Sequence, residues 1–483
     1  MNNKFIPIAL VSFLLTTPTH ASGPASANVM DYGAVGNGIT DDTSAFNDCL
    51  SNNQVCWVEP GKAFKVADVK MNEGNRLIGF GSVQYGMVKY QGSSPYDEAL
   101  KPVLIGGSGN RTEPSIIDAS YVSVGAGIEG ITIDCGGQTM NGISGGSNQL
   151  TVQDVTIVGC KNGIGGSGQN QSIDSYTSSA HITNSTFGGN EIGVANLVDS
   201  FVVNGDFANN SNIGLYLGAG ANANTIVNTR FEWNEGPGIS SYGGTAQNSI
   251  SNSFFDRNHG PGIVLIGVES MTISNSSFNR NGSINNAGND AQIDMYNSSN
   301  ISITGSTSTV GQDDGGIGVF TPKYIIAYGG TNKNISIAGM ATSGKFSSSN
   351  PDGSYTVAPT KGQEPTEGYS VVGVNDIPDT QPTVTGITAY SGGGRSNAKL
   401  LTSTVNTVST AGANNASVKL TKCVTGRQQT IANESDKPIK VYGKGSDKIN
   451  GNAAHLGIVQ IEYSIATYVC VRSNNWARIM SKD

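Results

Sequence analysis

The sequence lacks three features that would place it in common protein classes. Only 13% of its 483 residues are charged. After residue 21, no segment approaches the roughly 20 apolar residues that a membrane-spanning helix requires. No repeating segment keeps the 3.6-residue apolar period of a helix over ten or so residues, which excludes helical repeat arrays. A leucine-rich repeat is excluded because the chain has no comb of leucines. The 65 glycines and the low charge indicate a turn-rich, all-β secreted protein.

The charge of the chain is uneven, which bears on its partners. The formal net charge is -8, yet residues 401–483 hold ten Lys and Arg against five Asp and Glu, so the remainder carries -13. An acidic body argues against nucleic acid as a partner. The basic C-terminal segment is consistent with a solvated face or with contact to an acidic surface.

A repeat of about two dozen residues runs through the middle of the chain. Phenylalanine recurs at intervals of 20, 24, 24 and 23 residues, and an asparagine stands three residues after each one. The pairs are Phe187 and Asn190, Phe207 and Asn210, Phe231 and Asn234, Phe255 and Asn258, and Phe278 and Asn281. Self-similarity at this period indicates a solenoid, in which each repeat packs on its neighbours.

The residue types favour β-structure for this solenoid. Short runs such as Ile182–Phe187 alternate apolar and polar residues and are separated by Gly and Asn turns, which is typical of strands. We therefore predict a parallel β-helix with three short strands per coil and inward Phe, Ile and Val in columns. Asn tolerates a left-handed backbone at a corner, and its amide can bind the Asn of the next coil. The five asparagines predict an internal hydrogen-bonded ladder.

The N-terminus and the cysteines indicate export. Lys4, the apolar stretch Phe5–Leu15 and a small-residue cleavage site near Ala21 predict a signal peptide over residues 1–21. Six cysteines suit an oxidising compartment. Of 15 possible pairings we favour three local ones, because each pair is close in sequence or about one coil apart. These are Cys49–Cys56, Cys135–Cys160 and Cys423–Cys470.

Residues 28–50 contain a short strand, a Gly turn and an amphipathic helix with Thr40 or Asp41 as its cap. Within them, DYGAVGNGITDDTSAF at 31–46 resembles the opening motif of the pectate lyase superfamily, which includes polygalacturonases, rhamnogalacturonases and phage tailspikes. This resemblance implies an N-terminal helical cap on a right-handed single-stranded parallel β-helix. With the repeats it covers roughly residues 28–340, and it says little about the reaction.

The expected organisation has five parts. After the signal peptide come a cap with first coils at 28–125, the β-helix at 126–340, and a connector with possible last rungs at 341–400. A small C-terminal β domain then spans 401–483, where short strands such as Ile439–Tyr442 alternate with Gly and Asn turns. Val384–Tyr390 is considered for one more rung.

Candidate chemistry concentrates on two adjacent repeats, which read Phe-Glu-Trp-Asn-Glu and Phe-Asp-Arg-Asn-His where the repeats before them carry mostly small neutral residues. Neighbouring coils lie about 4.8 Å apart, so Glu232 and Asp256 are predicted to be stacked neighbours. Two close carboxylates repel, so one keeps its proton to higher pH. Such a pair can cleave a glycosidic bond. Candidate catalytic residues are Glu232, Asp256, Glu235 and His259.

Substrate contacts are expected around this pair. Trp233 can stack on a sugar ring, while Arg257 and Arg280 can hold a carboxylate or hydroxyls. Tyr242 and Asp294 are further candidates. The competing interpretation is a surface salt-bridge ladder in which the two arginines pair with Glu232 and Asp256.

No metal ligands and no cofactor are predicted. The pair Asp313-Asp314 resembles the paired Asp of polygalacturonases, but the Asn-Thr-Asp and Arg-Ile-Lys motifs of that family are absent. Residue roles are therefore not transferred, and a turn is favoured over a ligand or calcium contact there. The Asp-Pro-His motif of alginate epimerases is also missing.

The sequence thus favours a secreted glycoside hydrolase acting on a polysaccharide, with no nucleic-acid or membrane partner. One alternative is a polysaccharide lyase on a uronate-containing glycan, with Arg257 or His259 assisting proton abstraction. Another is a non-catalytic, tailspike-like glycan-binding protein. A monomer and a homotrimer both remain open.

Overall fold

The computed structural model describes most of the chain between residues 25 and 479. The described residues are 25–82, 102–108, 114–120, 124–137, 139–146, 149–165, 176–282, 290–309, 322, 324–343, 358–361, 370–372 and 383–479. The predicted signal peptide and Asp313-Asp314 lie outside them. Within these ranges, no helix has both the length and the hydropathy needed to cross a membrane.

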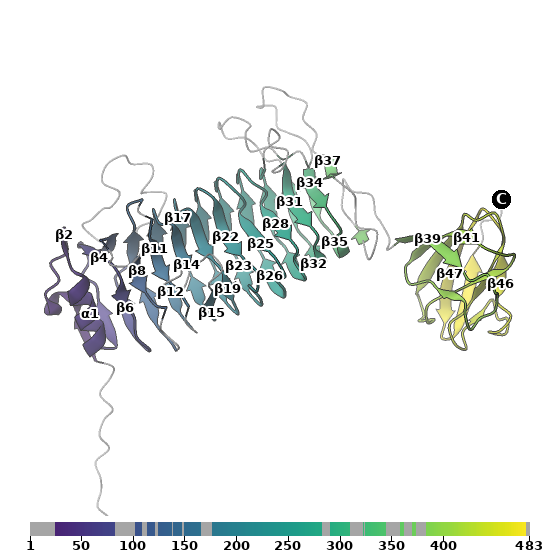
Figure 1. Cartoon of the computed structure of the whole chain (residues 1–483), viewed down its shortest axis with the longest axis horizontal. Coiled ribbons are helices and arrows are strands. Elements are labelled where there is room, and N and C mark those ends of the chain that lie inside the picture. Colours follow the sequence, from purple (N-terminus) through teal and green to yellow (C-terminus); the bar gives the residue numbers. More distant parts are fainter. Residues whose placement is uncertain are drawn as a thin grey trace, which may run out of the picture.

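Three long parallel sheets form a solenoid, as Figure 1 shows from purple to green. Each regular coil contributes one strand to sheet A, then one to sheet B, then one to sheet C. The predicted β-helix with three strands per coil is therefore confirmed, and it begins within the first thirty residues. Successive strands of one sheet pair in parallel register, so residues at equivalent positions of the repeats stack in columns.

Sheet A contains thirteen strands. They are β1 (Ser26–Asn28), β3 (Val55–Trp57), β6 (Arg76–Ile78), β9 (Gly127–Glu129), β12 (Thr151–Gln153), β16 (His181–Thr183), β20 (Phe201–Val203), β23 (Thr225–Val227), β26 (Asn248–Ser251), β29 (Met271–Ser274), β32 (Ser299–Thr304), β35 (Lys333–Ala338) and β38 (Ser370–Val372).

Sheet B contains twelve strands. They are β2 (Asn37–Asp41), β4 (Ala63–Val66), β7 (Val103–Gly106), β10 (Thr132–Asp134), β13 (Thr156–Val158), β17 (Thr186–Gly188), β21 (Asp206–Ala208), β24 (Arg230–Glu232), β27 (Phe254–Asp256), β30 (Ser277–Asn279), β33 (Thr307–Thr309) and β36 (Ala341–Ser343).

Sheet C contains eleven strands, and a short pair lies beside it. The eleven are β5 (Val69–Lys70), β8 (Ser115–Asp118), β11 (Asn141–Ser144), β14 (Asn162–Gly165), β18 (Ile192–Ala195), β22 (Ile213–Leu217), β25 (Ile239–Tyr242), β28 (Ile263–Ile266), β31 (Ala291–Tyr296), β34 (Tyr324–Gly329) and β37 (Ala358–Lys361). The short pair is β15 (Thr177–Ser178) and β19 (Leu197–Val198).

A helix covers the N-terminal end of the solenoid. After the 3-10 turn η1 (Val29–Tyr32), helix α1 (Thr43–Asn52) buries Phe46 and Leu50 against the first coils. The helix begins after Asp42, so the predicted cap at Thr40 or Asp41 is wrong. Residues 37–41 instead pair with β4 as strand β2, and the carboxylate of Asp42 accepts hydrogen bonds from the Val35 and Gly36 amides.

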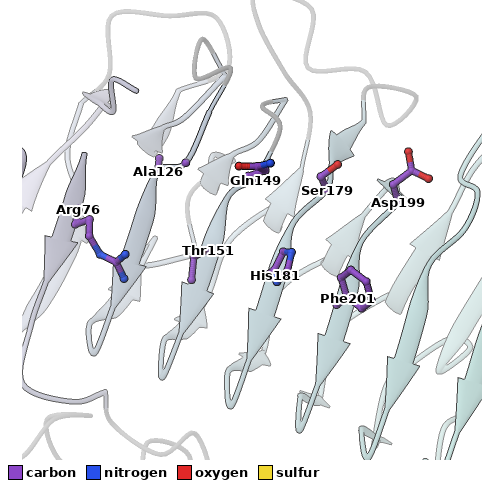
Figure 2. Close-up of a pocket in the computed structure, with 9 residues that line it drawn as sticks. Arg76, Ala126, Gln149, Thr151, Ser179, His181, Asp199 and Phe201 are labelled. Carbon is purple, nitrogen blue, oxygen red and sulfur yellow. The ribbon is translucent and has the colours of Figure 1, made fainter. Parts of the chain in front are cut away.

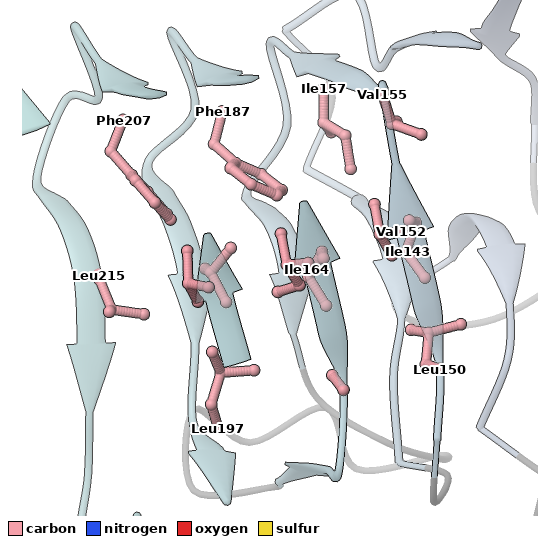
Figure 3. Close-up of a cluster of buried hydrophobic side chains, with 14 of the residues drawn as sticks. Ile143, Leu150, Val152, Val155, Ile157, Ile164, Phe187, Leu197, Phe207 and Leu215 are labelled. Atoms are coloured by element: carbon pink, nitrogen blue, oxygen red, sulfur yellow. The ribbon is translucent and has the colours of Figure 1, made fainter. Parts of the chain in front are cut away.

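The core of the solenoid is built from columns of apolar side chains (Figure 3). The five repeating phenylalanines are fully buried, and their ring centroids stack 4.8–5.0 Å apart. Ile164, Val194 and Leu215 form another buried column on sheet C. Because every coil repeats the same inward positions, each one covers the apolar face of the coil before it.

The five asparagines form the predicted ladder beside the phenylalanines. The side-chain amide of Asn210 donates to Asn234, Asn234 to Asn258, and Asn258 to Asn281, over 2.7–2.8 Å. Each amide also donates to a backbone carbonyl of an earlier coil; that of Asn234 binds Phe207 O at 3.0 Å. The ladder ends on Gln292, whose oxygen accepts from Asn281. The ladder thus satisfies buried polar groups at one corner of the solenoid.

Replacing one rung of this ladder is expected to destabilise the solenoid. Asn234→Ala removes a side chain that is fully buried and that bonds Asn210, Asn258 and Phe207. We expect a loss of about 1–3 kcal/mol in the free energy of unfolding, because partners remain buried without hydrogen bonds. Denaturant titration measures the loss. The control Asn212→Ala changes an exposed Asn of a neighbouring coil, and an equal loss in both variants would contradict the prediction.

The C-terminal domain has its own hydrophobic core, around Trp476, Tyr468 and Val441. One sheet holds β39 (Thr383–Ala389), β41 (Val405–Ala411), β43 (Gln428–Asn433), β47 (Ser464–Arg472), β48 (Asn475–Ile479) and β45 (Lys448–Ile449). The other holds β40 (Lys399–Leu400), β42 (Ala416–Lys419), β44 (Ile439–Tyr442) and β46 (Ile458–Gln460).

The segment 341–400 contains both solenoid strands and a strand of the C-terminal domain. Strands β36–β38 extend the three solenoid sheets as last rungs within the expected connector. Strand β39, in contrast, pairs with β41 of the C-terminal domain, so residues 384–389 add no rung to the solenoid. All three favoured disulfides are present, Cys49–Cys56, Cys135–Cys160 and Cys423–Cys470.

Candidate functional site

The outward side chains of sheet B gather the charged residues of mid-solenoid. In a strand, residues on either side of an inward Phe both point outward. One outward column runs through Asp206, Arg230 and Phe254, and the other through Ala208, Glu232 and Asp256. Glu232 and Asp256 are thus register partners on adjacent strands, as the repeat spacing predicts.

The carboxylate of Asp256 is buried and saturated with hydrogen bonds. Its side chain is 4% exposed. Arg280 donates to both of its oxygens, at 3.1 and 3.0 Å, and Arg257 donates to Oδ2 at 2.6 Å. Asn279 adds a fourth bond at 3.0 Å. Burial raises the pKa of Asp256, and the guanidinium groups of Arg280 and Arg257 oppose that rise. Both arginines are themselves 8% exposed, so for Asp256 the geometry is that of the salt-bridge ladder.

Glu232 is not paired with Arg257 or Arg280, as the predicted salt-bridge ladder would require. Its Oε2 accepts a 2.6 Å hydrogen bond from Arg230 of the same strand, and its side chain is 20% exposed. Arg230 is more open, at 55%, and its guanidinium lies 5.3 Å from the Phe254 ring centroid. Trp233 follows at the corner after β24, with the guanidinium of Arg257 4.7 Å from its ring centroid. Glu232 therefore stays accessible and paired to an exposed cation.

A third carboxyl group, Asp206, belongs to this cluster and was not among the predicted site residues. It stands one coil before Glu232 and two positions away along the strand. Burial, followed by the negative charge of Glu232, raises its pKa from 3.8 to about 6, and Arg230 partly opposes this. Among the described residues its Oδ1 is buried without a hydrogen-bond partner. A carboxyl group in this setting keeps its proton up to about pH 6.

The sequence contained a signal for Asp206. The site residues predicted from the repeats stand at positions that follow the repeated Phe. The position before Phe also faces outward, and it carries Thr186, Asp206, Arg230, Phe254 and Ser277. Asp206 and Arg230 are the charged members of that column, so the alternation of strand residues would have identified them.

The remaining predicted residues lie on other surfaces. Glu235 and His259 pair with each other on the turns between sheets B and C, where Nδ1 of His259 lies 2.5 Å from Oε2 of Glu235. Their side chains are 59% and 34% exposed. Tyr242 and Asp294 belong to β25 and β31 of sheet C. The structure therefore brings together Glu232, Asp256, Trp233, Arg257 and Arg280, but not the other four.

Among the described residues, no group of three or more His, Cys, Asp or Glu side chains is placed so that it could hold a metal ion.

Comparisons with known proteins agree with the architecture. Residues 141–308 match the sequence model of the family described as "Right handed beta helix region". The A-module of the mannuronan C-5 epimerase AlgE4 from Azotobacter vinelandii is 14% identical, with 70% of this chain and all of that chain covered and a TM-score of 0.45.

Two further solved structures are similar at the same level. A GH87 α-1,3-glucanase catalytic unit from Streptomyces thermodiastaticus is 12% identical, covers 73% of this chain and 70% of its own, and has a TM-score of 0.47. Tailspike protein 2 of bacteriophage CBA120 is 14% identical, covers 75% and 47%, and scores 0.42. With its three stacked parallel sheets and the match over residues 141–308, the chain contains a right-handed parallel β-helix.

Proposed function

We propose that this protein hydrolyses glycosidic bonds of a polysaccharide on the face of sheet B, with Asp206 as the general acid and Glu232 as its carboxylate partner. The proposal rests on the different surroundings of two neighbouring carboxyl groups, Asp206 and Glu232. Asp206 has a pKa of about 6, while Glu232 is bonded to the guanidinium of Arg230. Two carboxyl groups in unlike environments can supply the acid and the base of such a reaction.

The spacing of the two residues is compatible with an inverting mechanism. Asp206 and Glu232 are offset by one strand and by two residues along the strand, which places their Cβ atoms roughly 8 Å apart. Inverting glycosidases separate their carboxyl groups by about 6.5–9.5 Å. In this scheme protonated Asp206 gives its proton to the leaving oxygen, and ionised Glu232 takes a proton from the water that attacks the anomeric carbon.

The neighbouring residues then have supporting roles. Arg230 donates a hydrogen bond to the Glu232 carboxylate and holds it in place. Trp233 offers part of an aromatic surface beside the pair, where the apolar face of a sugar ring can pack. Asp256 acts as a positioning residue, because its four hydrogen bonds fix Arg257 and Arg280 behind the cluster. Glu235, His259, Tyr242 and Asp294 take no part in bond cleavage in this proposal.

Export through the N-terminal segment is part of the same proposal. Three disulfides link residues within the described chain, and disulfides persist in oxidising compartments. A secreted polysaccharide hydrolase is the activity that agrees with both the site and the cysteine usage.

A panel of neutral and uronic-acid polysaccharides tests the reaction class. The mature protein is incubated with each one at pH 5, while reducing ends and ultraviolet absorbance are followed. We expect new reducing ends without absorbance, and we expect Glu232→Gln to produce none. Absorbance rising together with reducing ends would mark an unsaturated uronate, making the protein a lyase and refuting the hydrolase. Retention of a glycan without either signal would favour a binding protein instead.

A further inference from the structure

A shallow depression lies on the outward face of sheet A, away from the carboxylates of sheet B. Its volume is about 570 Å³. Figure 2 shows Arg76, Thr151, His181 and Phe201 projecting from four strands on one face, with Gln149, Ser179 and Asp199 along the adjoining turns. Neither the repeat analysis nor the proposed hydrolysis uses these residues.

Residue size along one column creates the depression. Register pairing stacks Arg76, Gly127, Thr151, His181 and Phe201 on five adjacent strands. Gly127 and Thr151 are small, while Arg76 stands at one end and the two rings at the other. A Cβ atom on Gly127 would approach the Arg76 guanidinium to 3.4 Å. The Arg76 side chain therefore covers Gly127, and the depression runs from its guanidinium to Phe201 over about three strand spacings, or roughly 14 Å.

The two ends of the depression differ in chemistry. Phe201 is 44% exposed, and the His181 ring lies 5.1 Å from it at a 49° tilt. Exposed aromatic rings on a strand offer an apolar face beside polar groups. At the opposite end Arg76 is ion-paired with Glu129, so its charge is largely offset. Gln149, Thr151, Ser179 and Asp199 add hydrogen-bonding groups along the turns.

We propose that this depression is a second glycan-binding site, which holds a neutral oligosaccharide along the solenoid axis without cleaving it. The elongated floor fits a chain better than a compact small molecule. The aromatic end suits the apolar face of a sugar ring, and the polar turns suit its hydroxyls. The balance of Arg76 and Glu129, together with the negative Asp199, gives no net positive charge that would attract a uronate. Asp199 is the one carboxylate among the residues that line the depression, so the pair of carboxyl groups that hydrolysis needs is missing from this lining and we expect binding without turnover.

Affinity electrophoresis tests this site separately from hydrolysis. Glu232→Gln protein, in which the proposed cleavage is blocked, is run through native gels containing laminarin, dextran, galactomannan or polygalacturonate. We expect retardation by at least one neutral polysaccharide and none by polygalacturonate. Phe201→Ala in the same background should weaken the apparent affinity at least about tenfold, because the aromatic end of the site is lost. Gly127→Val, whose side chain would displace the Arg76 guanidinium that bounds the depression, should weaken it as well.

The matched control is Thr272→Ala, an exposed residue of the same column three strands beyond Phe201. It should leave retardation unchanged. Retardation that persists in both Phe201→Ala and Gly127→Val would overturn the proposal, as would the absence of retardation by every neutral polysaccharide. Reducing-end assays with otherwise wild-type Phe201→Ala protein on short oligosaccharides should remain unchanged. Failure of the sheet B hydrolase and failure of this binding site therefore give different results.

Discussion

Asp206→Asn is expected to lower kcat/KM on the susceptible polysaccharide by about 10²–10⁴-fold, the usual contribution of a positioned general acid. The amide keeps the shape of the side chain but has no proton to give at any accessible pH. In the unmodified enzyme, activity should fall as pH rises through about 6, because Asp206 loses its proton there. The residual activity of the variant should lack this decline. Rate–pH profiles over pH 4–8 measure both effects.

An exposed carboxylate provides the control for this variant. Asp154 lies on a turn of another coil, and Asp154→Asn should leave the profile unchanged. If Asp206→Asn retained the wild-type rate and the decline near pH 6, another group would be the acid.

The same titration has a consequence for stability. The pKa of Asp206 is about 6 in the folded protein and 3.8 ordinarily, so the folded state binds this proton more tightly. Its contribution to stability is therefore greatest below about pH 4 and is lost as pH rises toward 6. At pH 7.5 Asp206→Asn should raise the free energy of unfolding by roughly 2–3 kcal/mol. A variant that is less active and more stable would separate a catalytic role from a structural one.

Asp256→Asn should have the opposite effect on stability, with an expected loss of about 3–5 kcal/mol. The carboxylate accepts four hydrogen bonds, and the substitution leaves Arg257 and Arg280, each 8% exposed, without their counter-charge. Removing one partner of a buried ion pair costs more than the pair contributes, because the remaining charge stays buried. Denaturant unfolding at pH 7 measures the loss.

Glu235→Gln is the matched comparison, since it neutralises a carboxylate in an exposed pair with His259. A surface pair of this kind is worth at most about 1 kcal/mol. Similar small losses for Asp256→Asn and Glu235→Gln would show that the arginines remain solvated, and Asp256 would then be available for chemistry.

Much of the fold follows from the sequence because a solenoid repeats its inward positions. The spacing of Phe and Asn determined the stacked rings and the ladder, and the one-coil separation of Cys135 and Cys160 identified their pairing. The position at which the solenoid ends could not be predicted from the repeat. Residues 384–389 have the alternation of a strand, and alternation does not say which sheet the strand joins.

The candidate site was predicted in part, for a related reason. Register follows from the repeat, so the proximity of Glu232 and Asp256 was foreseeable. Hydrogen-bond partners depend on side-chain conformation and on the corner geometry of Arg257 and Arg280, whose φ angles are 52° and 57°. That geometry turns both arginines onto Asp256 and leaves Glu232 to Arg230, which spacing alone does not reveal.

The residue that ends the asparagine ladder suggests how such a scaffold acquires new loops. Gln292 is one methylene longer than the asparagines before it, and it stands eleven residues after Asn281 instead of the usual 20–24. Its amide nitrogen still reaches the Thr309 carbonyl at 2.9 Å. At this corner the longer side chain of Gln292 takes the place of an asparagine, and its amide oxygen and nitrogen both keep hydrogen-bond partners. We therefore expect this corner to accept a connection of different length while the coils beneath it stay unchanged.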